Sequence, residues 1–183
     1  MEEGNVEKNI EENIINIRKS TLGIFLLALA VVIVLVYFLA GSLGKNNNIN
    51  TIPVEGSTFL NTGDQIIVDS EGKPYVILFS TTWCSHCKWI KDTFDSLSEE
   101  EFSDKINLQH WELDIGDNTL TAEIETKVPD EMLSIYKKYN PKGSIPTFIF
   151  GGKYMRIGNG YESQGDLNTE LEDFKFIIGK LLE

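Results

Sequence analysis

Cysteine, histidine and basic residues are all scarce in this sequence. Its 183 residues include two Cys and two His. Two cysteines exclude a scaffold of several disulfides, and no second ligand pair exists for a zinc finger. Lys and Arg number 16 against 28 acidic residues, which gives a net charge of −12. Nucleic-acid binding needs a basic face, so this charge balance argues against a nucleic-acid partner.

One long hydrophobic run stands apart from an otherwise ordinary composition. Charged residues are absent from Ser20 to Gly44, and the stretch from Leu22 to Leu39 is nearly all apolar. About 20 apolar residues cross a bilayer as a helix, so we predict a transmembrane helix at 21–42 that serves as a signal-anchor. The alternatives are a buried core helix, which usually keeps a polar face, and a signal peptide cleaved near Ala40-Gly41-Ser42. A leader with five acidic residues disfavours cleavage.

The charges that flank this span predict its orientation. Arg18 and Lys19 precede it directly, whereas Lys45 is the one nearby base that follows. Positive charge favours the cytoplasmic side, so the rest of the chain is expected outside the membrane. The predicted divisions are a cytoplasmic segment 1–20, the membrane helix 21–42, a polar linker 43–64 and a folded domain 65–183.

The folded domain alternates strand and helix patterns. The expected strands are 75–79, 106–113, 147–150 and 153–157. The expected helices are 84–98, a helix that begins at Pro129 and ends near Asn140, and a last helix that begins near Ser163 or Asp166. A continuous apolar run such as 75–79 is typical of a strand covered on both faces. Gly151-Gly152 between the last two strands indicates a hairpin.

Both cysteines lie in Trp83-Cys84-Ser85-His86-Cys87-Lys88, at the start of an expected helix. Zinc and iron–sulfur sites need more ligands, and covalent haem attachment needs histidine at the place of Lys88. What remains is redox chemistry between two thiols, an inert buried pair, or a stapling disulfide. The start of a helix favours the thiolate of Cys84, which is the reactive form. His86 either adds positive charge there or is a plain exposed polar residue.

Residues 65–183 resemble the thioredoxin superfamily. The resemblance rests on Phe79 to Lys88 with the dithiol, on Ser144 to Phe148 with its proline, and on the glycines after the hairpin at 158 and 160. It implies an α/β fold, a thioredoxin-like three-layer sandwich, preceded here by the one N-terminal transmembrane helix. It also implies that Ile145–Pro146 is a cis peptide that packs against the dithiol.

The resemblance further implies an enzyme, a protein thiol–disulfide oxidoreductase. Cys84 would exchange with the client, Cys87 would resolve the mixed disulfide, and Trp83, Ile145, Pro146 and Thr147 would contact substrate. The redox-active disulfide Cys84–Cys87 does the chemistry, with no cofactor or metal. The implied partners are cysteine-containing client proteins and a membrane redox partner at the outer face of the cell membrane.

The two residues between the cysteines, Ser85 and His86, bear on whether the protein oxidises or reduces its clients. Cys-x-His-Cys is similar to the dithiols of periplasmic disulfide oxidases and protein disulfide isomerases, so His86 favours an oxidase or isomerase. The alternatives are a membrane-tethered reductase and a client-capturing binding module with little turnover.

Two departures from the family's pattern stand out. Thioredoxins place a buried acid six residues before the first cysteine, and here that residue is Leu78. His110, on the next strand, is either an alternative base or a half-exposed strand histidine with satisfied hydrogen bonds. Residues 115–128 form an expected insertion, either a short helix or a loop beside the site.

Overall fold

The computed structural model describes residues 50–183. The predicted cytoplasmic segment 1–20 and the membrane helix 21–42 lie outside the described residues, as does the first part of the predicted linker. Within residues 50–183, none of the helices combines the length and the apolar character that crossing a membrane requires.

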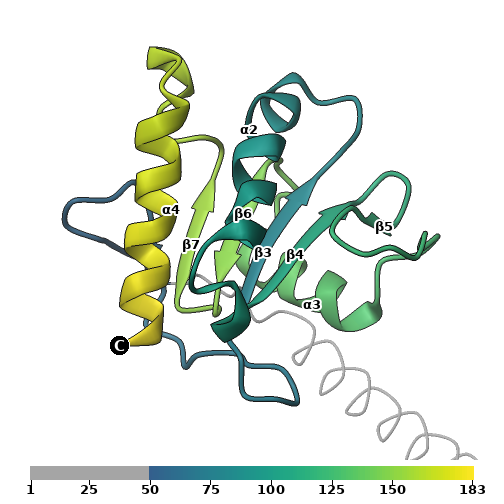
Figure 1. Ribbon diagram of the computed structural model, residues 1–183, viewed down its shortest axis with the longest axis horizontal. Helices are drawn as coiled ribbons and strands as arrows, with labels where there is room; N and C mark the ends of the chain where they lie inside the picture. Colours follow the sequence, from purple (N-terminus) through teal and green to yellow (C-terminus); the bar gives the residue numbers. More distant parts are fainter. Residues whose placement is uncertain (1–49) are drawn as a thin grey trace, which may run out of the picture. The chain divides into compact units, whose positions relative to one another are not determined.

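A seven-stranded sheet forms the centre of the described domain, in the order β1-β2-β7-β6-β3-β4-β5 (Figure 1). Its strands are β1 (Ile52–Pro53), β2 (Leu60–Asn61), β3 (Tyr75–Ser80), β4 (Asn107–Glu112), β5 (Asp117–Asn118), β6 (Thr147–Phe150) and β7 (Tyr154–Ile157). β3 and β4 are parallel, so the chain must cross over between them, and the other neighbours are antiparallel.

Helices cover both faces of the sheet. They are α2 (Ser85–Asp95), α3 (Asp130–Tyr139) and α4 (Leu167–Leu182), with short 3-10 turns at η1 (Ser96–Glu99), η2 (Ser103–Lys105) and η3 (Glu162–Gln164). Figure 1 shows α2 and α4 in front of the sheet and α3 behind it. The predicted α/β architecture of three layers is confirmed for the described domain.

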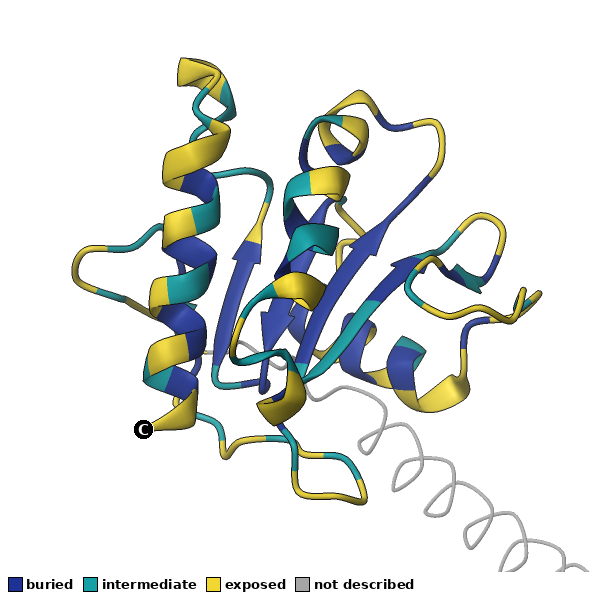
Figure 2. Ribbon diagram, viewed as in Figure 1, coloured by how far each residue is buried: buried dark blue, intermediate teal, exposed yellow. Residues whose placement is uncertain are grey.

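The alternation of side chains along β3 builds the two halves of the core. Val76 and Leu78 pack with the apolar residues of α2 and α4. Ile77 and Phe79 face the other way and pack with those of α3. Successive residues of a strand point to opposite faces, so a strand buried on both faces is apolar throughout. Figure 2 shows β3, β6 and most of β7 dark blue between helices that are yellow on their outer sides.

The structure extends the domain further toward the N-terminus than the sequence predicts. Residues 43–64 are expected to be a linker, but β1 and β2 join the edge of the sheet. The physical reason is Phe59, which is fully buried and packs against Phe150 with the ring centroids 4.8 Å apart. A single aromatic anchor between two-residue strands leaves no periodic pattern in the sequence.

Some helix ends also differ from the prediction. α2 ends at Asp95 and continues as the 3-10 turn η1, instead of running to residue 98. Pro129 is the N-cap of α3, one residue before its first helical position. Of the two predicted starts of the last helix, Asp166 is confirmed as the N-cap, because its carboxylate accepts from Thr169 N at 2.9 Å.

Candidate active site

The dithiol lies where β3 passes into α2. Cys84 is the N-cap of α2 in an extended conformation (φ −73°, ψ 124°), and no side chain caps the free N–H groups of the first turn. Cys87 lies in that first turn, on the buried side of α2. The uncapped helix start therefore leaves backbone N–H donors beside Cys84.

Asp114 holds the turn that leads to the dithiol. Its carboxylate accepts from Thr82 N at 3.1 Å and from Thr82 Oγ1 at 2.5 Å. Partial burial acts to raise the pKa of Asp114, but the hydrogen bonds from Thr82 outweigh it, and the pKa lies below the ordinary value. Trp83, next along the chain, is 69% exposed and available to a partner.

The two thiols differ in their surroundings. Cys84 is 7% exposed and Cys87 is 2% exposed. Burial raises the pKa of Cys87 to about 12, and the neighbouring Cys84 contributes to the rise. Cys84 is therefore buried as well, although it is the more accessible of the two. Cys87 holds its proton at neutral pH.

His86 is bound by a carboxylate, that of Glu162, which no sequence motif indicates. Its Nδ1 lies 2.8 Å from Glu162 Oε2, with the His86 side chain 63% exposed and that of Glu162 30% exposed. Asn159 joins the pair, because its Nδ2 donates to His86 O at 2.9 Å and to Glu162 Oε2 at 2.8 Å. Glu162 therefore offsets the positive charge that a protonated His86 brings to the start of α2.

The predicted cis peptide Ile145–Pro146 is confirmed. It precedes Thr147, which pairs with Phe79 near the end of β3, so it lies at the edge of the sheet where the dithiol begins. Thr147 is fully buried, and its Oγ1 accepts from Asn140 Nδ2 and donates to Ser144 O, both at 2.8 Å. The Thr147 side chain therefore holds its own loop, whereas Ile145 is partly exposed and can meet a substrate.

His110 is fully buried, which corrects the expectation of a half-exposed strand histidine. Its Nε2 lies 2.8 Å from Ser80 Oγ, and its Nδ1 lies 2.7 Å from Asp95 Oδ1. Leu78, where the family's acid would lie, is also fully buried and belongs to the apolar core. Ser80 and Asp95 were not recognised as site residues from the sequence.

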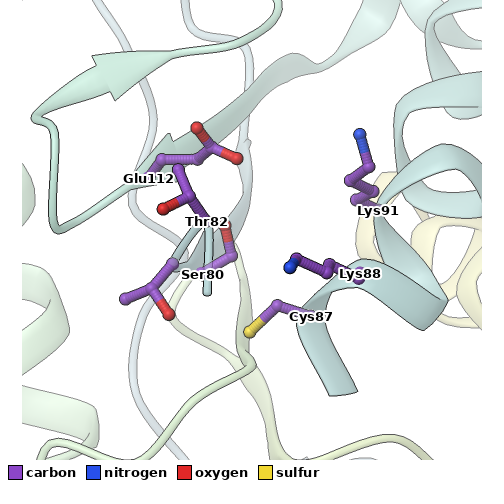
Figure 3. A pocket seen from close by; sticks show the side chains of 7 residues that line it. Ser80, Thr82, Cys87, Lys88, Lys91 and Glu112 are labelled. Carbon is purple, nitrogen blue, oxygen red and sulfur yellow. The ribbon is translucent and has the colours of Figure 1, made fainter. Parts of the chain in front are cut away.

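A hollow of about 230 Å³ lies between the sheet and α2, beside Cys87 (Figure 3). Ser80 lines it from β3 and Glu112 from β4, while Lys88 and Lys91 line it from α2. A water molecule takes up about 30 Å³ of liquid, so the hollow has room for several. Among the described residues, no group of three or more His, Cys, Asp or Glu side chains is arranged to hold a metal ion.

Residues 115–128 form a loop rather than a helix. Its first part is β5, which pairs with β4. Glu125 closes the loop, since its carboxylate accepts from Asn118 N at 3.2 Å and its N–H donates to Asp117 Oδ1 at 2.8 Å. Gly116 has φ +76°, and a Cβ there would lie 2.7 Å from the backbone N of Lys127, so the loop closes too tightly for a side chain.

The folded domain is similar to known proteins. A family described as a thioredoxin-like domain matches residues 63–175. Thioredoxin of Oryctolagus cuniculus is 34% identical over 96 residues, which cover 51% of this chain and 72% of the relative. Thioredoxin of Homo sapiens is 34% identical over 99 residues, which cover 53% and 75%. A solved thioredoxin of Malassezia sympodialis (Mala s 13) aligns with a TM-score of 0.32 and 22% identity over 53% of this chain and 74% of that chain.

The family match and the curated relatives show that the chain belongs to the thioredoxin superfamily. Fold and relatives together suggest thiol–disulfide oxidoreductase activity at the general level.

Proposed function

We propose that this protein is a thiol–disulfide oxidoreductase of the oxidase or isomerase type, acting on cysteines of client proteins. The observation that carries the proposal is the unequal environment of the two thiols. Cys84 lies at an uncapped helix start, and Cys87 lies beneath it with its pKa raised to about 12 by burial. One sulfur is suited to exchange with a client and the other to close or open the internal disulfide.

In the oxidising direction the electrons pass from client to protein. A client thiolate attacks Sγ of Cys84, the Cys84–Cys87 bond breaks, and Cys87 leaves as a thiolate that takes up a proton. A second client thiolate then attacks the client sulfur of the mixed disulfide, and Cys84 leaves as a thiolate. The client gains a disulfide, and the protein is left as the dithiol. A membrane redox partner would restore the protein disulfide.

The same proposal places the domain at the outer face of the cell membrane. Its support is the apolar run at 22–39 with Arg18 and Lys19 before it. Protease added to intact cells should then reach residues 45–183. Protection of the domain until the membrane is opened would contradict this placement.

A reductase is the second candidate, and two observations favour it. The curated relatives are named thioredoxin. Glu162 also binds His86, so part of the positive charge that favours an oxidising dithiol is offset. Both candidates use the same two sulfurs and differ in the potential at which the protein works.

The reduction potential decides between them. Reference values run from about −270 mV for thioredoxin through about −180 mV for protein disulfide isomerase to about −120 mV for the periplasmic oxidase. We expect a potential above about −220 mV, lowered by His86→Pro, as measured by equilibration with glutathione. A value near or below about −260 mV that the substitution leaves unchanged would select the reductase.

Trapping tests the roles of the two cysteines. Cys87→Ser should accumulate mixed disulfides with client proteins, because no second sulfur releases them. Cys84→Ser should capture few, since Cys87 is buried and protonated. Equal capture by both variants would contradict the assignment of Cys84 as the exchanging sulfur.

A further inference from the structure

Hydrogen-bonded side chains form a row from Asp95, at the C-terminal end of α2, through His110 to Ser80, which lines the hollow beside Cys87. Asp95, at the end of α2, meets His110 Nδ1 at 2.7 Å, and His110 Nε2 meets Ser80 Oγ at 2.8 Å. The His110 side chain is 1% exposed and that of Asp95 is 28% exposed. The row therefore has one end in the solvent and the other end at the hollow that Cys87 lines.

The hydrogen bonds fix the direction of this row. An ionised Asp95 can only accept, so His110 Nδ1 carries the proton that they share. His110 Nε2 is then the acceptor and Ser80 supplies the hydroxyl proton. An imidazole with an unprotonated Nε2 that accepts from Ser80, and with a carboxylate at its Nδ1, is arranged to take one further proton.

Cys87 needs a proton acceptor, and this row of hydrogen-bonded side chains can supply one. To resolve a mixed disulfide on Cys84, Cys87 must attack as a thiolate, yet its pKa is raised to about 12. Burial is the largest cause of this rise and remains when Cys84 is in the mixed disulfide, so the Cys87 thiolate is scarce at pH 7. Leu78 stands where the family's acid would be and cannot accept a proton.

We propose that Ser80, His110 and Asp95 form a proton relay for Cys87. The proposal rests on the proposed thiol–disulfide exchange and deepens it. In the resolving step, the Cys87 proton passes through water in the hollow to Ser80 Oγ, while Ser80 gives its own proton to His110 Nε2. The Cys87 thiolate attacks Sγ of Cys84, the bond from Cys84 to the client sulfur breaks, and the client leaves as a thiolate. Asp95 stabilises the imidazolium and connects it to solvent.

Other ionisable groups face Cys87, and Glu112 is the one that competes for this role. Glu112 lines the same hollow from β4, while Lys88 and Lys91 line it from α2 (Figure 3). Asp114 and Tyr136 also lie near enough to interact with the charge of Cys87. Glu112 lies opposite two lysines and has no hydrogen-bonded path to a buried base. The relay is therefore the better acceptor, and Glu112→Gln is the variant that tests this choice.

The experiment separates the two sulfur steps in one trace. The full chain, reduced and held in detergent, is mixed with excess dithiobis(nitrobenzoate), a disulfide that releases one coloured thiolate at each step. The first release reports attack by Cys84, and the second reports resolution by Cys87. Ser80→Ala, Asp95→Asn and His110→Gln should leave the first release within about twofold and slow the second by about 10²-fold at pH 7, the lower end of general-base effects.

The pH profile gives a readout that a purely structural role would not move. Without the relay, hydroxide must remove the proton, so the second release should accelerate about tenfold per pH unit in the variants and less steeply in the unmodified protein. Thr62→Val is the matched control, since it removes a buried hydroxyl that donates to Gly152 O and does not line the hollow. Its second release should match the unmodified protein.

Each other outcome has a definite meaning. If Glu112→Gln slows the second release and Ser80→Ala does not, the relay is wrong and Glu112 is the base. If both releases slow together, or Thr62→Val slows the second as much as Ser80→Ala, the effect is structural and the relay is overturned. Ser80→Ala keeps the His110–Asp95 pair, so the test stands even if His110→Gln fails to fold. An unmodified protein without a second release would overturn the proposed function itself.

Discussion

The burial of Cys87 makes a quantitative prediction about its reactivity. Replacing Cys84 by serine leaves Cys87 as the one thiol, so that its rate can be measured without competition. The contribution of Cys84 to the raised pKa is lost in this variant, but burial, the largest cause, remains.

The expected rate follows from the thiolate fraction and its nucleophilicity. With both thiols present, the pKa of Cys87 is raised to about 12, against about 8.5 for a free cysteine, which lowers the thiolate fraction near neutral pH by about 3 × 10³-fold. A more basic thiolate is a better nucleophile, and a Brønsted coefficient of about 0.4–0.5 recovers about 40-fold of that loss. Because the Cys84→Ser variant lacks the contribution of Cys84, about 10²-fold is the upper limit of the slowing that the raised pKa causes, and the 2% exposure of Cys87 adds to it.

The assay is exchange with hydroxyethyl disulfide, a small neutral disulfide, followed by mass spectrometry. The reference is the same Cys84→Ser variant unfolded in urea, which keeps the local sequence and removes the burial. Cys87→Ser, in which Cys84 is the remaining thiol, should exchange at least as fast as its own unfolded chain. If folded Cys84→Ser exchanges within tenfold of its unfolded form, the burial argument fails, and with it the need for a base at Cys87.

Three further predictions concern potential and stability. At pH 6, His86→Ala should lower the reduction potential and Glu162→Gln should raise it, each by about 5–20 mV. The potential of the double variant should be close to that of the unmodified protein. Shifts of the same sign in the two single variants would contradict the offsetting of charges. Arg156→Met should cost about 3–5 kcal/mol in urea denaturation, because it leaves Glu170 and Asp173 buried without their cation; a loss below about 1 kcal/mol would contradict this. The raised pKa of Cys87 stabilises the reduced fold below pH 9.0, and that stability should disappear as the pH rises to about 12. The oxidised protein has no Cys87 thiol and should lack this term, so a constant difference between the two forms would count against it.

Much of the fold can be predicted because its signals are local. The continuous apolar run of β3, the glycine pair before β7 and the apolar stripes of the helices each depend on neighbouring residues. The ends of α2 and the strands β1 and β2 could not be predicted in the same way. They depend on contacts with distant parts of the chain, such as Phe59 with Phe150 and Phe174.

In the candidate site, too, the residues in short motifs can be predicted and those that depend on distant contacts cannot. The dithiol and the cis proline stand out in the sequence as short motifs, and the structure brings them to one edge of the sheet. Glu162 lies 76 residues from His86, and Asp95 lies 15 residues from His110. Neither carboxylate belongs to a motif, and with 28 acidic residues in the chain nothing in the sequence distinguishes these two. Their roles arise from the topology that folds η3 and the end of α2 onto other elements.

The proposed relay beneath Cys87 places the proton acceptor at other residues than position 78, where Leu78 stands in the place of the family's acid. Residues two apart on a strand share a face, so Leu78 and Ser80 both face α2, and the register pairs them with His110 and Glu112 on β4. Leu78 completes the apolar core among Ile90, Phe94 and Phe148. A charge at that depth would need a partner that those side chains cannot supply. His110 and Ser80 provide the proton acceptor instead, because Asp95 reaches His110 from the end of the helix that begins at the dithiol. If this reasoning is right, Leu78→Asp should fail to replace a lost Ser80 hydroxyl in the release assay. Restoration of the second release by that substitution would show that the depth of position 78 does not decide where the base lies.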